Sequence, residues 1–252
     1  MESILKIENL TKIFKKKGQE DFTAVDNISF DLKKGEILGI VGESGSGKST
    51  LVKMITRLLD TTSGKVIFNG NDVTNIKGSK LREYYSHIQM VFQSPHDSFD
   101  PRRTLGTSVG EVLHNRGMKR EDEKERVIEL FKMCEIAPEM VKRYPHQVSG
   151  GQCQRAAIAR AIAINPEILI CDEATSALDV TIQKDIVTLL KSLQKKLGMS
   201  VLFICHDIAL VQEMCDRVIV MNSGKLVEEG IPDEVIKNPR EEYTKNLIAS
   251  VL

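Results

Sequence analysis

The sequence predicts an α/β protein with a mostly parallel core sheet, an N-terminal antiparallel β subdomain and an α-helical insert. Three observations support this fold class. Short apolar segments alternate with longer amphipathic segments along most of the chain, as strands and helices do in a parallel sheet. Alternating strand patterns occupy the first part of the chain. Polar residues repeatedly follow an apolar segment directly, and the carboxyl ends of parallel strands are where such sheets bind ligands.

The composition is that of a globular protein. Its 252 residues are 41% hydrophobic, which is enough to bury a substantial core. The 35 basic residues balance the 35 acidic ones, so the charge gives no support for a nucleic-acid partner. The five cysteines form no CxxC pair and lie inside apolar or helical patterns, so we expect reduced, buried thiols and therefore a cytoplasmic protein. No apolar run approaches the ~20 residues of a membrane span, so we expect any membrane role to be peripheral.

The N-terminal segments predict an antiparallel hairpin. Residues 4–10 and 25–32 alternate between apolar and polar side chains, as half-buried strands do. A further strand is expected over residues 65–68, before an Asn-Gly turn.

A strand, a glycine-rich loop and a helix follow one another in the first third of the chain. Residues 36–41 predict a strand that is apolar after Glu36, and residues 48–59 predict the helix that the loop opens. Leu51, Ile55 and Leu58 are expected on one face of this helix.

The middle of the chain predicts a helical insert over residues 94–147. The preceding apolar strand over residues 88–92 ends at Gln93, and prolines then punctuate two helical patterns, near residues 106–115 and 121–135. The expected organisation is one domain over 1–252, with 1–93 and 148–252 forming the core.

After the insert, strands and helices alternate again. Ser149 is expected to cap a helix that runs to about residue 164, and a buried strand over 168–171 ends at Asp172. A helix with apolar spacing over 182–197 precedes a strand over 201–205, which stops at His206. Residues 218–221 and 225–228 then predict a hairpin through an Asn-Ser-Gly turn.

The first glycine-rich loop predicts a phosphate cradle. Its glycines let the backbone wrap a phosphate, Lys48 supplies a positive charge, Ser49 can bind Mg²⁺, and Thr50 adds a hydroxyl. The order of strand, loop and helix argues against an ordinary glycine turn. The predicted cradle comprises Gly42, Glu43, Ser44, Gly45, Ser46, Gly47, Lys48, Ser49 and Thr50.

Two carboxylates follow the strand over residues 168–171. Asp172 stands at the strand end, where it suits a Mg²⁺ contact, and Glu173 could polarise an attacking water. Taken alone, such a pair is also a common start of a helix.

Three further residues are candidates by position. His206 could contact a terminal phosphate, or be a satisfied histidine at a strand end. Gln93 could reach a metal ion or an attacking water. Phe14 could stack on a base, or be a half-buried aromatic at the end of a strand.

A second glycine-rich turn lies roughly a hundred residues after the first. Ser149, Gly150, Gly151 and Gln152 open a helix and could present backbone N–H groups and a hydroxyl to an anion. The chain therefore carries two phosphate-binding surfaces.

These motifs resemble those of the nucleotide-binding subunits of ABC transporters, over nearly the whole chain. In chain order they are the Walker A motif at 42–50, the Q-loop at Gln93, the signature at 148–152, the Walker B motif with its catalytic glutamate at 168–173, the D-loop with Ser176 and Asp179, and the switch histidine at His206. Departures are mild: Val148 replaces a leucine, and Cys153 and Cys205 stand where polar residues are common.

The resemblance implies a P-loop NTPase core that binds ATP and Mg²⁺. Catalytic roles fall on Lys48, Gln93, Glu173 and His206, metal binding falls on Ser49, Gln93 and Asp172, and adenine stacking falls on Phe14. The resemblance also implies a head-to-tail dimer, in which the signature of one nucleotide-binding subunit closes over the ATP of the other. Two transmembrane permease subunits and, indirectly, an extracytoplasmic solute-binding protein would complete an importer, with this subunit at the cytoplasmic face of the membrane.

A finer resemblance concerns the cargo. Residues 93–102 and 238–245 are similar to segments of oligopeptide, dipeptide and nickel importers, although Asp100, Glu241 and Glu242 depart from the usual residues. The end at Leu252, without a cysteine-bearing extension, slightly favours a nickel or metal-chelate importer. The alternative function is a soluble, non-transport ABC ATPase, such as a cluster-assembly ATPase.

Overall fold

The computed structural model describes residues 2–15, 18, 20–174 and 178–249, and the chain divides into two compact units. The first unit is Met1–Tyr85 with Ser200–Leu252, and the second is Ser86–Met199. Among the described residues, no helix is long and apolar enough to cross a membrane.

The first unit contains the predicted antiparallel sheet, in the order β2-β1-β4-β5. Its strands are β1 (Ser3–Phe14), β2 (Phe22–Lys33), β4 (Ser63–Phe68) and β5 (Asn71–Asp72). The β1–β2 hairpin that the sequence predicts is confirmed, with Ile7 opposite Phe30. Both strands lose regular register near Asn9 and Asn27, which adopt φ of 49° and 52°.

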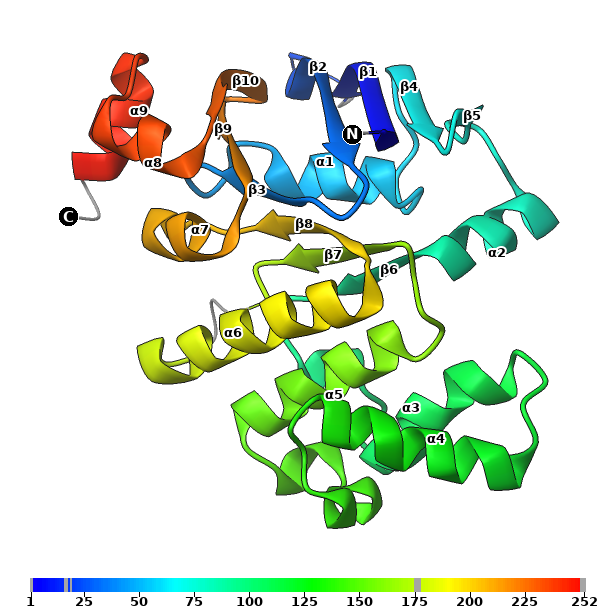
Figure 1. Cartoon of the computed structure of the whole chain (residues 1–252). Coiled ribbons are helices and arrows are strands. Elements are labelled where there is room, and N and C mark those ends of the chain that lie inside the picture. The colour runs from blue at the N-terminus through cyan, green and yellow to red at the C-terminus, as the bar shows by residue number, and fades with distance from the viewer. Residues whose placement is uncertain (1, 16–17, 19, 175–177, 250–252) are drawn as a thin grey trace. The chain divides into compact units, whose positions relative to one another are not determined.

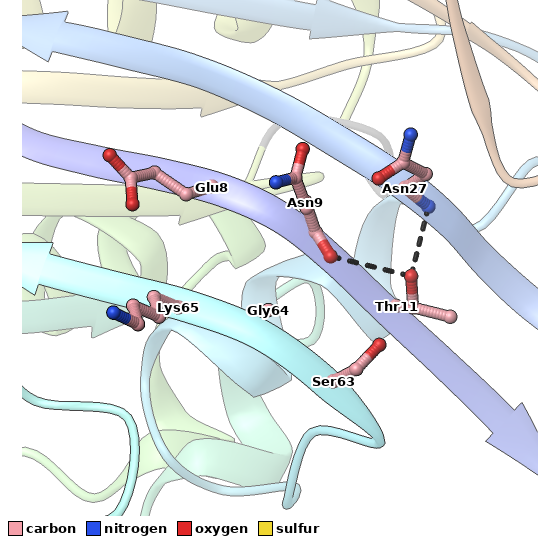
Figure 2. A pocket seen from close by; sticks show the side chains of 7 residues that line it. All are labelled: Glu8, Asn9, Thr11, Asn27, Ser63, Gly64 and Lys65. Carbon is pink, nitrogen blue, oxygen red and sulfur yellow. Dashed lines mark hydrogen bonds between the residues drawn. The ribbon is translucent and has the colours of Figure 1, made fainter.

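Polar groups hold this irregularity together. The Thr11 hydroxyl donates to the carbonyl oxygen of Asn9 at 3.4 Å and accepts the N–H of Asn27 at 3.0 Å, as Figure 2 shows. A hollow of about 450 Å³ lies here, and Ser63 and Gly64 also line it. None of the predicted site residues that the structure describes borders this hollow.

The first unit also holds the strands that carry the phosphate loop (Figure 1). Strand β3 (Ile37–Val41) is fully buried and pairs in parallel with β8 (Ser200–Ile204) and β9 (Arg217–Asn222), and β10 (Lys225–Gly230) is antiparallel to β9. Continuous apolar residues are expected in parallel strands, because helices cover both faces. Helices α1 (Lys48–Ile55), α7 (Ile208–Met214), α8 (Pro232–Lys237) and α9 (Glu242–Ala249) belong to this unit.

Helix α1 ends earlier than the sequence predicts. It stops at Ile55, because Arg57 turns to a left-handed φ of 59°. The expectation that Leu58 lies on one face of this helix with Leu51 and Ile55 was wrong, since Leu58 follows the end of α1 and is 57% exposed. Helix α2 (Gly78–His87) was not predicted.

Among its described residues, the second unit contains one parallel strand pair and the predicted helical insert. Strand β6 (Ile88–Val91) pairs with β7 (Ile168–Asp172). The helices are α3 (Leu105–His114), α4 (Arg120–Met133), α5 (Gly150–Ile162) and α6 (Val180–Leu197), and three short 3₁₀ helices are η1 (His96–Ser98), η2 (Pro138–Lys142) and η3 (Pro145–Gln147). Both predicted insert helices are present, within one or two residues of their expected ends.

The insert is held together by close packing. Phe131 and Leu130 of α4 are fully buried with Leu105 and Val109 of α3. Gly106 of α3 lies so near Val141 that any Cβ there would clash with it. The unit therefore presents the Ser149 turn on a packed helical base.

Candidate functional site

The phosphate cradle lies between β3 and α1, as the sequence predicts. A Cβ on Gly42 would lie well inside contact distance of the Met221 carbonyl oxygen, and one on Gly47 would meet the Ala24 carbonyl oxygen in the same way. Gly47 has φ 102°, which disfavours any other residue. Only glycine fits these two positions, because the loop packs its backbone directly on neighbouring backbone.

Lys48 is buried at the centre of the cradle, with 4% exposure. Its ammonium donates to the carbonyl oxygens of Gly42 at 2.7 Å and Glu43 at 2.8 Å, and to the Ser46 hydroxyl at 3.3 Å. The loop therefore folds around the cation that is expected to meet phosphate oxygens. Helix α1 begins beside it with no side-chain cap, which leaves the helix dipole directed toward the loop.

The turn between β9 and β10 supports the cradle. Gly224 donates its N–H to the Ser46 carbonyl at 3.0 Å, and its own carbonyl accepts the Asp26 N–H at 2.8 Å. The hydroxyl of Tyr243 accepts the Glu43 N–H at 3.0 Å. Sequence reasoning missed these supports, because residues this far apart give no local signal.

His206 leaves the sheet at the same level as the cradle. Ile40 of β3 pairs with Ile204 of β8, and Gly42 and His206 each follow their strand residue by two positions. His206 is exposed, and the neighbouring Asp207 caps α7 by accepting the Ala209 N–H at 2.8 Å.

Phe14 stands at the end of β1 with 40% of its surface exposed. It pairs across the hairpin with Phe22, and the Lys12 ammonium lies 5.2 Å from the centre of its ring. An exposed ring at a strand end is available for stacking, as the prediction requires.

In the second unit, Gln93 and Glu173 share one edge of the β6–β7 pair. Val91 pairs with Cys171, so Gln93 and Glu173 each lie two residues beyond paired positions. Asp172 is 9% exposed and Glu173 is half-buried. Glu173 has φ 49°, a left-handed conformation that is uncommon outside glycine and recurs at functional sites.

The second glycine turn begins α5 as predicted. The Ser149 hydroxyl accepts the Gln152 N–H at 3.2 Å, and the Gln152 side chain accepts the Ser149 N–H at 3.0 Å, a reciprocal capping box. A Cβ on Gly151 would lie 2.8 Å from Ile182, so this glycine permits close packing against α6.

The structure describes one of the two predicted D-loop residues. Ser176 lies outside the described residues. Asp179 caps α6, accepting the Ile182 N–H at 3.0 Å.

The donors expected for Mg²⁺ have suitable chemistry. Ser49 offers a hydroxyl, Gln93 an amide oxygen and Asp172 a carboxylate, and Mg²⁺ prefers oxygen ligands. Ser49 lies in the first turn of α1. Asp172 ends β7, and Gln93 follows the end of β6, at the same edge of this strand pair.

Comparison with known proteins identifies the family. The ABC transporter family model matches residues 25–176. The chain belongs to the ABC transporter family. It is 45% identical to the oligopeptide transport ATP-binding protein OppF of Bacillus subtilis, over 99% of this chain and 83% of that protein, and 42% identical to the dipeptide transport ATP-binding protein DppF of Lactococcus lactis, over 98% and 81%.

Solved structures agree with the family assignment. The ATP-binding cassette MJ0796, solved as a dimer in a post-hydrolysis state with ADP and Pi, is 34% identical, with a TM-score of 0.82 over 90% of this chain and 98% of that one. The predicted α/β fold class and the prediction of an ABC ATPase are therefore confirmed. The roles assigned to individual residues of this ABC cassette stay predictions.

Proposed function

We propose that this ABC cassette binds and hydrolyses ATP to drive an importer. The observation that carries the proposal is the cradle, in which a buried ammonium is held by loop carbonyls beside an uncapped helix start. The similarity to transport ATP-binding proteins supports the same conclusion.

The residues of the first unit would bind the nucleotide. Lys48 would keep its hydrogen bond to the Gly42 carbonyl oxygen and turn from the Glu43 carbonyl oxygen and the Ser46 hydroxyl to phosphate oxygens. The first turn of α1 would direct its dipole at the same charge. Phe14 would stack on the adenine, and His206 would contact the terminal phosphate.

The residues of the second unit would carry out hydrolysis. Glu173 would act as the general base toward the attacking water, and Gln93 would orient that water. Asp172 would supply an oxygen ligand to Mg²⁺, as Ser49 of the first unit would, and the ion would supply positive charge that neutralises phosphate. Removing a general base typically slows turnover by a factor of about 10²–10⁴.

The partners would be a second nucleotide-binding subunit and two permease subunits, placing the cassette peripherally at the cytoplasmic membrane face. A solute-binding protein would act outside the membrane. The names of the relatives support a peptide as cargo, and nickel or a metal chelate remains the alternative within the same proposal. We propose that the segment from residue 94 onward faces the permease. Phe92, just before Gln93, is exposed, and an exposed aromatic side chain is available for contact with another protein.

A mixing experiment tests both the ATPase and the head-to-tail dimer. Lys48→Ala removes the cradle cation, and Ser149→Arg blocks the signature; each variant alone should be nearly inactive in a Mg²⁺-dependent ATPase assay. Mixed together, they should regain activity, because a mixed dimer has one intact cradle facing one intact signature.

The matched control mixes Lys48→Ala with the double variant Lys48→Ala/Ser149→Arg, in which no dimer has an intact cradle. Activity should then stay at background. An inactive unmodified chain would contradict the ATPase, and absent recovery beside an active unmodified chain would contradict the dimer.

Co-purification tests the importer against a soluble ATPase. The tagged cassette, expressed with its chromosomal neighbours and extracted in detergent, should retain two multi-span membrane proteins. Recovery of only soluble partners would favour the cluster-assembly alternative.

A further inference from the structure

The C-terminal helix of the first unit contacts the phosphate cradle through one side chain. The hydroxyl of Tyr243, in the first turn of α9, accepts the Glu43 N–H at 3.0 Å, although the two residues are 200 positions apart. Glu43 is exposed and Tyr243 is half-buried, so the contact lies at the open side of the cradle.

This hydrogen bond acts on the peptide group that also holds the catalytic cation. The Gly42–Glu43 peptide donates its N–H to Tyr243 and accepts the Lys48 ammonium on its carbonyl oxygen at 2.7 Å. A peptide group is planar, so its N–H and carbonyl turn together. Rotating this peptide would move the carbonyl away from Lys48, and glycine at 42 offers little resistance to such rotation.

Tyr243 is itself fixed by the packing of α9. Thr244, Leu247 and Ile248 of this helix are buried. The preceding segment is anchored by Glu228 of β10, whose carboxylate accepts the N–H groups of Arg240 at 3.0 Å and Glu241 at 3.3 Å.

The protonation states of Glu228 and Tyr243 suit the hydrogen bonds that they accept. Burial works to raise the pKa of Glu228, but the backbone hydrogen bonds and the nearby charge of Arg240 bring it below its usual value, so the carboxylate stays ionised. Burial raises the pKa of the Tyr243 phenol, which stays neutral and keeps its oxygen available as an acceptor.

We propose that Tyr243 is a positioning residue for nucleotide binding, which fixes the Gly42–Glu43 peptide and thereby the resting place of the Lys48 ammonium. The proposal rests on the proposed ATPase function. It assigns α9 a part in nucleotide affinity, beyond its part in the fold.

The test removes a single oxygen atom. Tyr243→Phe keeps the ring and its packing, so the thermal midpoint should stay within about 1 °C of the unmodified protein. The Kd for ADP, measured by calorimetry with ADP and Mg²⁺, should rise about two- to tenfold, the range expected for one hydrogen bond. The KM for ATP should rise by a similar factor, with kcat unchanged.

Glu242→Gln separates the Tyr243 hydroxyl from a general change on α9, and Leu247→Ala tests whether the packing of α9 acts through Tyr243. Glu242→Gln alters the neighbouring exposed residue of the same helix and should leave Kd and KM unchanged. Leu247→Ala opens a cavity under α9; it should lower the thermal midpoint and, by loosening Tyr243, also raise the Kd for ADP.

The outcomes distinguish this inference from the function on which it rests. If the unmodified chain binds neither ADP nor ATP, the proposed function fails. If it binds both and Tyr243→Phe shows the same Kd and KM, the positioning role of Tyr243 is refuted alone. A fall in kcat and thermal midpoint with unchanged Kd would also refute it, since that pattern marks a structural role only.

Discussion

The edge of the β3–β8 pair and the edge of the β6–β7 pair are built alike but held differently. In each, two parallel strands release their chains in register: Gly42 with His206 in one unit, Gln93 with Glu173 in the other. Three other segments fasten the cradle edge: Ala24 and Gly224 contact it through their backbone, and Tyr243 contacts it through its side-chain hydroxyl.

The other edge instead holds a carboxylate residue in a left-handed conformation. Glu173 has φ 49°, while Gln93 beside it is exposed. Under the proposed residue roles, nucleotide binding would depend on a preformed backbone and hydrolysis on the side chains of Gln93 and Glu173. Disrupting the cradle backbone should have the largest effect on the protein.

The cradle should be intolerant of a single methyl group. Gly47→Ala forces a Cβ into the Ala24 carbonyl at φ 102°, so we expect a loss of about 3 kcal/mol or more in the free energy of unfolding. Urea denaturation with and without ADP measures it.

The matched control for this change is Gly45→Ala. Gly45 has φ 83°, but a Cβ there would meet no atom within 4 Å. Gly45→Ala should lower the free energy of unfolding by only about 1 kcal/mol, through backbone strain. Equal losses for both variants would show that close backbone packing does not define the cradle.

The stability of the start of β3, the strand that leads into the cradle, should depend on Arg217. Arg217 at the start of β9 donates to Glu36, just before β3, at 2.8 Å and 3.1 Å, and Glu36 is 7% exposed. Arg217→Met leaves Glu36 buried without this cation, so we expect the free energy of unfolding to fall by about 2–3 kcal/mol. This is less than for a fully buried pair, because Arg217 is partly solvated.

Replacing both partners is the sharper version of this experiment. Arg217→Met with Glu36→Gln should recover about half of that loss, because no charge is left buried. A double variant as unstable as the sum of two single losses would contradict this account.

The fold was largely predictable where local chemistry sets it. The Ser149 cap, the two insert helices and the strand before the cradle each follow from patterns within about fifteen residues. Helix α2 escaped prediction because Tyr84 is its only buried residue, so it shows no apolar stripe. The end of α1 depends on Arg57 adopting φ 59°, a conformation that no sequence pattern marks.

The sequence predicted the main residues of the candidate site, but it did not predict the distant residues that hold the cradle in place. Lys48, Asp172, Glu173 and His206 were found because each follows an apolar strand or a glycine-rich loop. Tyr243 could not be found in this way, since its role follows only from the packing of α9 against distant parts of the first unit.

The hydrolysis edge should carry measurable strain. Glu173→Gly suits φ 49° better than Glu173→Ala does, so the glycine variant should be more stable by about 1 kcal/mol in urea denaturation. Both should lack turnover. An alanine variant as stable as the glycine variant would mean that residue 173 relaxes freely.

The smallest effect concerns thiol reactivity. Burial raises the pKa of Cys153 to about 11, so at pH 8 only about 0.1% of it is thiolate. Cys215, half-buried in the first unit, should be alkylated by iodoacetamide first, as peptide mass mapping would show. Faster labelling of Cys153 would mean that the signature helix opens readily.

The most direct test of the division between binding and hydrolysis compares Lys48→Ala with Glu173→Gln in the same preparation. Glu125→Gln, an exposed glutamate of α4, is the control for losing one carboxylate. We predict that Glu173→Gln keeps the ATP affinity of the unmodified chain and loses turnover by about 10²–10⁴, whereas Lys48→Ala loses ATP binding itself. Near-normal turnover in Glu173→Gln, or undiminished ATP affinity in Lys48→Ala, would contradict the account.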